Sequence, residues 1–244
     1  MLIRDEHIQR HDYGAVGPKE QFIVPLLRWH IEQVLSTYGK PTSLHPRVLD
    51  VGCGLQPFRK NLEALGYAYS SIDAQQNPES LVDVVCQIDQ PLPPEIVDYG
   101  TFDFILCTEV MEHIADWDMA FHNFDQLLAP GGRMFITCPH FYQLHEEPYD
   151  FWRATPYAFH YFGNKFGLKI LHQVHAGDAW DILGTLLANF SSLPASRSLR
   201  DRILNKIVSQ GRQFLFQLLV SRRLQQSVHL HGPLYLANIV VFEK

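Results

Sequence analysis

The sequence has little that would place this protein in a membrane or in an oxidising compartment. No apolar run is long enough to span a bilayer, and the first residues have no signal-peptide core. Only four cysteines occur, without a Cys-x-x-Cys pair, which argues against both a zinc site and a disulfide framework. We therefore expect a cytoplasmic protein whose reduced cysteines are small apolar fillers. They are Cys53, Cys86, Cys107 and Cys138.

An excess of basic residues is also missing. The 244 residues include 26 acidic and 20 basic side chains, and this net charge of −6 excludes a global electrostatic attraction to nucleic acid. With 46% hydrophobic residues, the chain can bury a full core. We expect one domain, with a helical cap over 1–44, a cofactor-binding core over 45–177, a helical insertion or lid over 178–230 and a last strand within 231–244.

Strand-like and helix-like patterns alternate along the chain. This alternation predicts an α/β fold, a seven-stranded, mostly parallel, doubly wound sheet with a helical insertion before the last strand. Strands are expected over 48–51, 69–73, 81–85, 102–107, 133–138, 168–174 and 236–242. Helices are expected over 22–35, from Pro57 to Leu65, over 117–128 and over 156–166, and Asp116 is the expected N-cap of the third.

A glycine turn follows the first of these strands. Gly52 and Gly54 lack a Cβ, so the chain can turn sharply there and a ligand can approach the backbone closely. Pro57 then favours the first turn of a helix. Asp73 ends the next strand about 20 residues later, the position of a ribose-binding carboxylate in nucleotide-binding α/β folds. The pattern indicates an adenosine-containing ligand, and its plainer alternative is an ordinary turn between a strand and a helix.

The charge around the turn distinguishes between adenosine ligands. A dinucleotide site favours a third glycine where Pro57 stands and a helix N-terminus that faces a pyrophosphate. Here Asp50 places a negative charge just before the turn instead. S-adenosylmethionine carries a sulfonium and an ammonium group and no phosphate, so carboxylates at Asp50 and Asp73 suit it better than they suit NAD.

Four motifs in this order resemble the class I S-adenosylmethionine-dependent methyltransferases. They are Leu49 to Gly54, Asp73, Phe102 to His113 and Leu127 to Arg133, and the resemblance covers about residues 45–175 and the last strand. It implies that S-adenosylmethionine is the cofactor. It also implies cofactor contacts from Asp50, Gly52, Cys53, Gly54, Asp73, Gln87, Ile88 and Thr108. Gln87 departs from the aspartate that is usual in the family.

A narrower resemblance follows the fifth expected strand. Residues 137–140 and 145–156 are similar to methyltransferases found among bacterial genes for surface polysaccharides and glycosylated products. This implies O-methylation of a sugar, a glycoside or another small hydroxylated acceptor. Nitrogen or carbon acceptors stay open, as does a non-catalytic protein that binds an adenosine ligand. An NAD-dependent sugar enzyme is disfavoured, because Tyr161 and Lys165 miss the Tyr-x-x-x-Lys spacing by one residue.

Candidate catalytic residues lie in this same stretch. Transfer to a hydroxyl requires removal of a proton, which a histidine can accept near neutral pH while a carboxylate orients its ring. His145 with Asp150 or Glu146 is the first candidate pair, and His140 is the second base candidate. The same side chains could instead hold a long loop, or gather a Mg²⁺ ion. Arg153 is expected to pair with Asp150 or to meet an anionic acceptor. We expect no metal.

The insertion has a local charge bias. Between Arg197 and Arg223 there are seven basic residues and one acid, Asp201, and the apolar residues follow one helical stripe. A basic amphipathic helix can lie on an anionic membrane surface. A lid or a homodimer helix with a solvated basic face is the alternative.

Overall fold

The computed structural model of the protein describes residues 10–189, 198–223 and 233–244. Within them, strands form one sheet of order β3-β2-β1-β4-β5-β7-β6, in which β7 runs antiparallel to the other six strands. The predicted seven-stranded, mostly parallel sheet is confirmed. The strands are β1 (Arg47–Val51), β2 (Ala68–Asp73), β3 (Val84–Val85), β4 (Phe102–Thr108), β5 (Leu128–Pro139), β6 (Lys169–Ala176) and β7 (Ala237–Glu243).

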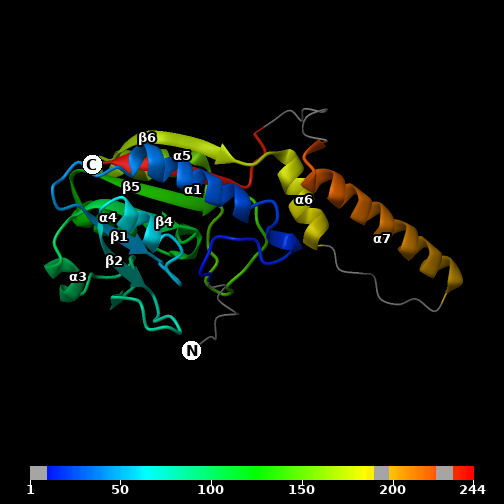
Figure 1. Ribbon diagram of the computed structural model, residues 1–244, viewed down its shortest axis with the longest axis horizontal. Coiled ribbons are helices and arrows are strands. Elements are labelled where there is room, and N and C mark those ends of the chain that lie inside the picture. The colour runs from blue at the N-terminus through cyan, green and yellow to red at the C-terminus, as the bar shows by residue number, and fades with distance from the viewer. Residues whose placement is uncertain (1–9, 190–197, 224–232) are drawn as a thin grey trace.

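Helices cover both faces of the sheet. They are α1 (Val24–Tyr38), α2 (Arg59–Ala64), α3 (Pro94–Asp98), α4 (Trp117–Leu127), α5 (Pro156–Lys165), α6 (Ala179–Asn189) and α7 (Leu199–Val220), with short 3₁₀ helices η1 (Pro18–Glu20) and η2 (Met111–His113). Helices α3, α4 and α5 contribute to the core on one face, and α1 and α2 to the core on the other. Helices α6 and α7 lie beyond one end of the sheet, where α7 extends outwards (Figure 1).

Strand β4 shows why the sheet is buried on both faces. Phe104 and Leu106 belong to the core beneath α1, whereas Ile105 and Cys107 belong to the core beneath α4, and all four are fully buried. Because successive side chains of a strand point to opposite faces, a nearly all-apolar strand must be covered on both. Asp116 caps α4 as predicted, since its carboxylate accepts a hydrogen bond from the backbone N–H of Met119.

Several element boundaries differ from the sequence prediction. Strand β3 contains two residues instead of the expected five, because side chains of the preceding loop bind the backbone N–H groups of Leu81 and Val82. The helix expected from Pro57 begins at Arg59. Helix α3 forms where no helix was expected, and β5 begins at Leu128 instead of at residue 133.

The parallel strands β1, β2, β4 and β5 end at one edge of the sheet, where open α/β folds bind ligands. No helix in the described part of the chain is long and apolar enough to cross a membrane. Of the expected insertion, residues 190–197 and 224–230 lie outside the described residues. The predicted division into cap, core, insertion and last strand stays a prediction, as does the cytoplasmic location.

Candidate active site

The glycine turn forms a backbone cradle at the end of β1. Gly52 and Gly54 have φ angles of 67° and 50°, in the left-handed region that favours glycine. The backbone N–H groups of Gly52 and Cys53 both donate to the carbonyl of Ile72. A Cβ at Gly52 would lie 2.3 Å from Cγ2 of Val110, whereas one at Gly54 would meet nothing within 4 Å. Gly52 is therefore required by close packing, and Gly54 borders open space that a ligand can enter.

Two buried carboxylates flank this turn. The carboxylate of Asp73 accepts a hydrogen bond of 3.0 Å from the N–H of Gly54, and that of Asp50 accepts one of 2.7 Å from the Tyr69 hydroxyl. Burial raises the pKa of Asp50 to about 7 against the effect of this hydrogen bond, and the charge of Asp73 adds to the rise. The pair creates a negative potential that suits a cationic ligand and opposes a pyrophosphate.

A larger cavity of about 750 Å³ opens beside β2 and β4. Its walls include the predicted cofactor residues Gly52, Asp73, Gln87 and Ile88. Ile88 is buried, and its backbone carbonyl accepts a hydrogen bond of 2.6 Å from the side chain of Asn123. The cavity thus joins a carboxylate, an apolar wall and the glycine turn, as an adenosine group requires.

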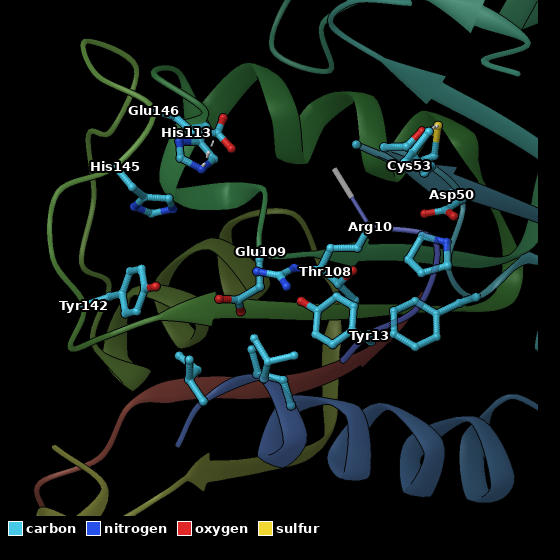
Figure 2. A pocket seen from close by; sticks show the side chains of 18 residues that line it. Arg10, Tyr13, Asp50, Cys53, Thr108, Glu109, His113, Tyr142, His145 and Glu146 are labelled. Atoms are coloured by element: carbon cyan, nitrogen blue, oxygen red, sulfur yellow. Dashed lines mark hydrogen bonds and ion pairs between the residues drawn. The ribbon is translucent and has the colours of Figure 1, made fainter. Parts of the chain in front are cut away.

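Figure 2 shows the side chains that line a second, smaller cavity of about 160 Å³. The two cavities share Gly52, Glu109 and His113 in their walls. Predicted cofactor residues that line the smaller cavity are Asp50, Gly52, Cys53, Gly54 and Thr108. Figure 2 shows Asp50 and Cys53 at one end of it, the group of His113, His145 and Glu146 at the other, and Thr108 and Glu109 between them.

Two carboxylates that follow β4 lie beside the smaller cavity. Glu109 has a φ of 54°, and its backbone N–H donates to the Thr137 hydroxyl at 3.0 Å. Burial raises the pKa of Glu109 to about 7. Glu112 is fully buried, and neither of its side-chain oxygens has a hydrogen-bond partner among the described residues. Burial raises the pKa of Glu112 well above its usual range. Strained backbone and orphaned buried carboxyl groups are both typical of functional sites.

Two histidines face the buried Glu112. The Nε2 atom of His113 lies 3.7 Å from Oε1 of Glu112, and that of His145 lies 3.8 Å from the same oxygen. The two imidazole centroids are 4.8 Å apart. His145 belongs to the segment after β5, which is held over the end of β4 because the N–H groups of Phe151 and Trp152 donate to the carbonyl of Glu112.

The structure brings together two of the three predicted catalytic residues. Nδ1 of His145 lies 3.3 Å from a carboxylate oxygen of Asp150 without a hydrogen bond between them, and the backbone N–H of His145 donates to the same oxygen. Arg153 binds both oxygens of Asp150, as expected. Burial by itself would raise the pKa of Asp150, but the hydrogen bonds from Arg153 and from the His145 backbone outweigh burial and lower it. His140 instead stacks on Tyr235 at 4.3 Å and lines neither of the two cavities. The structure therefore does not bring His140 to the site.

A metal ion has candidate ligands here. One atom each from Glu112, His113 and His145 lies within 4.8 Å of the others. This set differs from the one considered in the sequence, because His140 lies elsewhere and Asp150 is bound to Arg153. The orphaned carboxyl group of Glu112 fits a cation, since buried charges in proteins are paired or coordinate metals. Mixed imidazole and carboxylate ligands suit Mn²⁺, Fe²⁺ or Zn²⁺ better than Mg²⁺.

Sequence reasoning missed several residues of the smaller cavity. Tyr13 packs on the ring of Phe58 at 5.1 Å, and Arg10 forms a bidentate ion pair with Glu20. These contacts fold the N-terminal segment over the site, and its polar sequence carries no signal of this. Glu109 was detectable, because it follows a buried parallel strand directly and such strand ends meet at the ligand-binding edge.

The sheet order, the glycine turn with its two carboxylates and the two neighbouring cavities define a class I S-adenosylmethionine-dependent methyltransferase fold. The chain belongs to the methyltransferase domain family, whose sequence model matches residues 27–173. The prediction that the chain is an S-adenosylmethionine-dependent methyltransferase is confirmed.

Curated relatives are similar over part of their length. A ubiquinone biosynthesis O-methyltransferase of Mesorhizobium japonicum is 29% identical over 137 residues, which are 51% of this chain and 55% of that protein. The mitochondrial human protein of the same name is 29% identical over 141 residues, 51% of this chain and 37% of its own. The chain thus spans about half or less of the length of these relatives. The predicted link to polysaccharide genes stays a prediction.

Solved structures support the fold. A SAM-dependent methyltransferase from Archaeoglobus fulgidus has a TM-score of 0.53 at 14% identity, and covers 93% of this chain and 97% of its own. A Burkholderia thailandensis 1,6-didemethyltoxoflavin-N1-methyltransferase, solved with S-adenosylhomocysteine, has a TM-score of 0.54 at 12% identity, and covers 90% and 78%. At sequence identities of 14% and 12%, this similarity supports the fold alone.

Proposed function

We propose that this chain transfers a methyl group from S-adenosylmethionine to a hydroxyl oxygen of a small acceptor. The observation that supports this most strongly is that two cavities share Gly52, Glu109 and His113 in their walls. One cavity has the features of an adenosine site, and the other has the polar side chains that an acceptor needs. Methyl transfer is an in-line displacement, so the protein must mainly align the two reactants and exclude water.

The residues of the glycine turn and the larger cavity fit the cofactor. Asp73 would bind the ribose hydroxyls, and Asp50 would hold the ammonium group of the methionine part. Gln87 and Ile88 would flank the adenine, and the open space at Gly54 allows the methionine part to pass close to the backbone. When bound, S-adenosylmethionine supplies the electrophilic methyl group.

His145 is the residue best placed to accept the acceptor's proton. It lines the smaller cavity, and Asp150 lies 3.3 Å from its Nδ1 atom. Arg153 holds that carboxylate from the other side, so Asp150 can orient the imidazole without being protonated itself. In this assignment the proton of the acceptor hydroxyl moves to Nε2 of His145, and Asp150 is a positioning residue.

The acceptor proposed first is a sugar or a glycoside, as the segment after β5 suggests. A phenolic ring is the second candidate, because Tyr13, Phe58 and Tyr142 give the smaller cavity an aromatic lining. The names of the relatives describe O-methyltransferases, which supports oxygen over nitrogen or carbon as the methylated atom.

Calorimetric titration tests the cofactor, with S-adenosylmethionine and NAD in separate experiments. We expect micromolar affinity for the first and no binding of the second. Transfer of a labelled methyl group to sugars, glycosides, phenols and amines then tests the acceptor class. Binding of NAD alone or of neither ligand would contradict the proposal, and cofactor binding without transfer to any acceptor would favour a non-catalytic binding protein.

A divalent cation at Glu112, His113 and His145 is the alternative proposal, in which His145 is a metal ligand instead of the base. Replacing Glu112 with Gln is expected to weaken Mn²⁺ binding at least about tenfold, because the substitution removes a charged ligand. Calorimetry or electron paramagnetic resonance of the Mn²⁺-titrated protein measures this directly, without any assay of activity. Glu95→Gln, at an exposed position of α3, is the matched control and should bind as the unaltered protein does. Equal Mn²⁺ binding by the unaltered protein, the Glu112→Gln variant and the Glu95→Gln control would contradict the proposal.

A further inference from the structure

Helix α7 leaves most of its surface uncovered. Of its 22 residues only Leu219 is buried, and the helix extends away from the sheet beyond α6 (Figure 1). A helix of a globular protein normally buries an apolar stripe against the core. Here the large apolar side chains that the structure leaves exposed are Leu199, Ile203, Leu204, Ile207, Val208, Phe214 and Val220.

These apolar side chains form a continuous strip. Leu199, Ile203 and Ile207 recur every four residues, and Phe214 follows seven residues later, so they lie along one line of the helix. Their exposed fractions are 54–70%. Leu204 and, four residues on, Val208 widen the strip on one side. An exposed apolar strip of this length marks an interaction surface.

The charge of α7 indicates what this surface binds. The helix carries four basic residues and one acid, and hence three net positive charges, in a chain whose net charge is −6. A second copy of α7 would bring the same positive charge against it, which disfavours pairing between two such helices. An anionic bilayer offers both an apolar layer and negative headgroups. No described helix could cross such a bilayer, so the contact would be at its surface.

We propose that α7 docks the protein on an anionic lipid bilayer. The line of Leu199, Ile203 and Ile207 would enter the boundary between headgroups and acyl chains, and Arg202 and Lys206, at its side, would meet lipid phosphates. Long basic side chains of this kind reach out to headgroups while their stems stay near apolar surface.

Contacts of α7 and the residues just after it with Phe22 and with α6 relate this surface to the proposed active site. Phe216 packs edge-on against Phe22 at 5.5 Å, and Arg222, just beyond α7, forms an ion pair of 2.5 Å with the buried Asp181 of α6. Ile23 and Val24, which follow Phe22, line the smaller cavity. A docked α7 would therefore hold one wall of that cavity near the bilayer.

Vesicle co-sedimentation of the full chain tests the proposal. We expect binding to vesicles of phosphatidylcholine with phosphatidylglycerol, and at least about tenfold weaker partitioning to pure phosphatidylcholine or in high salt. The double substitution Ile203→Glu and Ile207→Glu should reduce partitioning at least about tenfold. Val97→Glu, at a site of 53% exposure on α3, is the control and should bind as the unaltered chain does. Circular dichroism checks that each variant is folded.

Two outcomes would overturn the proposal. One is that the chain fails to bind anionic vesicles in a way that the double substitution weakens. The other is a dimer in sedimentation velocity that this substitution converts to a monomer without any vesicle binding, which would make α7 a homodimer contact. If the double variant does not fold, Arg202→Glu with Lys206→Glu replaces it, with the same expected loss. Vesicle binding needs neither cofactor nor acceptor, so its failure is distinguishable from failure of the proposed activity.

Discussion

Replacing His145 with Ala is expected to reduce methyl-transfer turnover at least about a hundredfold, which is within the usual contribution of a general base. The imidazole lines the smaller cavity with Asp150 beside it, so its removal leaves the acceptor hydroxyl without a proton acceptor. Asp50 and Cys53, two of the predicted cofactor residues, lie at the other end of the smaller cavity (Figure 2), and affinity for S-adenosylmethionine should therefore change little. Steady-state turnover with an identified acceptor and calorimetric titration measure the two quantities.

His140→Ala is the matched control for this experiment. His140 belongs to the same segment, but its ring stacks on Tyr235 and its Nδ1 donates a hydrogen bond to the backbone carbonyl of Ala154, away from both cavities. Its replacement should leave turnover near normal. Near-normal turnover of His145→Ala would instead reject the base assignment. Mn²⁺ titration of the His145 variant separates loss of a base from loss of a metal ligand, because only the latter weakens cation binding.

Replacing Asp50 with Asn is expected to have opposite effects on cofactor binding and on stability. The pKa of the Asp50 carboxyl rises from 3.8 to about 7 on folding, so protonation of this group favours the folded state. This contribution to stability is fully present below the unfolded pKa and is lost as the pH rises through 7. At pH 8 the folded protein holds a buried negative charge. Asparagine removes this cost, which is up to about 4 kcal/mol for a shift of about three units, and can still accept the Tyr69 hydrogen bond. The free energy of unfolding should therefore increase at pH 8 and change little below pH 4.

The same substitution removes a charge that would hold the ammonium group of the cofactor. We expect affinity for S-adenosylmethionine at pH 8 to fall at least about tenfold, because charge-assisted hydrogen bonds are about twice as strong as neutral ones. Denaturant unfolding at the two pH values and calorimetry provide the measurements. Asp98→Asn, at an exposed position at the end of α3, should affect neither quantity. A variant that is less stable at pH 8 would contradict the assignment of a costly buried charge to Asp50.

The cofactor half of the site was predictable because its residues are local in sequence. Gly52 and Gly54 follow a short apolar strand, and Asp73 ends the next one, so pairing of two adjacent parallel strands suffices to bring them together. All eight predicted cofactor residues line one or both of the described cavities. Their individual roles stay predictions.

The acceptor half of the site was harder to predict from the sequence, because segments that are distant along the chain form it. Tyr13 reaches the smaller cavity only because the N-terminal segment folds over the site, and His145 meets Glu112 only through backbone hydrogen bonds across more than thirty residues of sequence. The sequence offered His145 as the first base candidate and His140 as the second, and the ring of His140 stacks on Tyr235 of the distant C-terminal segment. Such choices depend on packing between segments, which periodicity does not encode.

The amino-acid sequence by itself determined the alternating α/β pattern, the glycine turn and the two acidic strand ends, because each arises from backbone geometry and neighbouring residues. Only the tertiary structure decided that Glu112 is buried without a hydrogen-bond partner among the described residues, that the two cavities share three wall residues, and that the apolar strip of α7 is exposed. Burial and cavity shape depend on which surfaces the whole fold brings into contact, and this depends on the packing of segments that are distant in sequence.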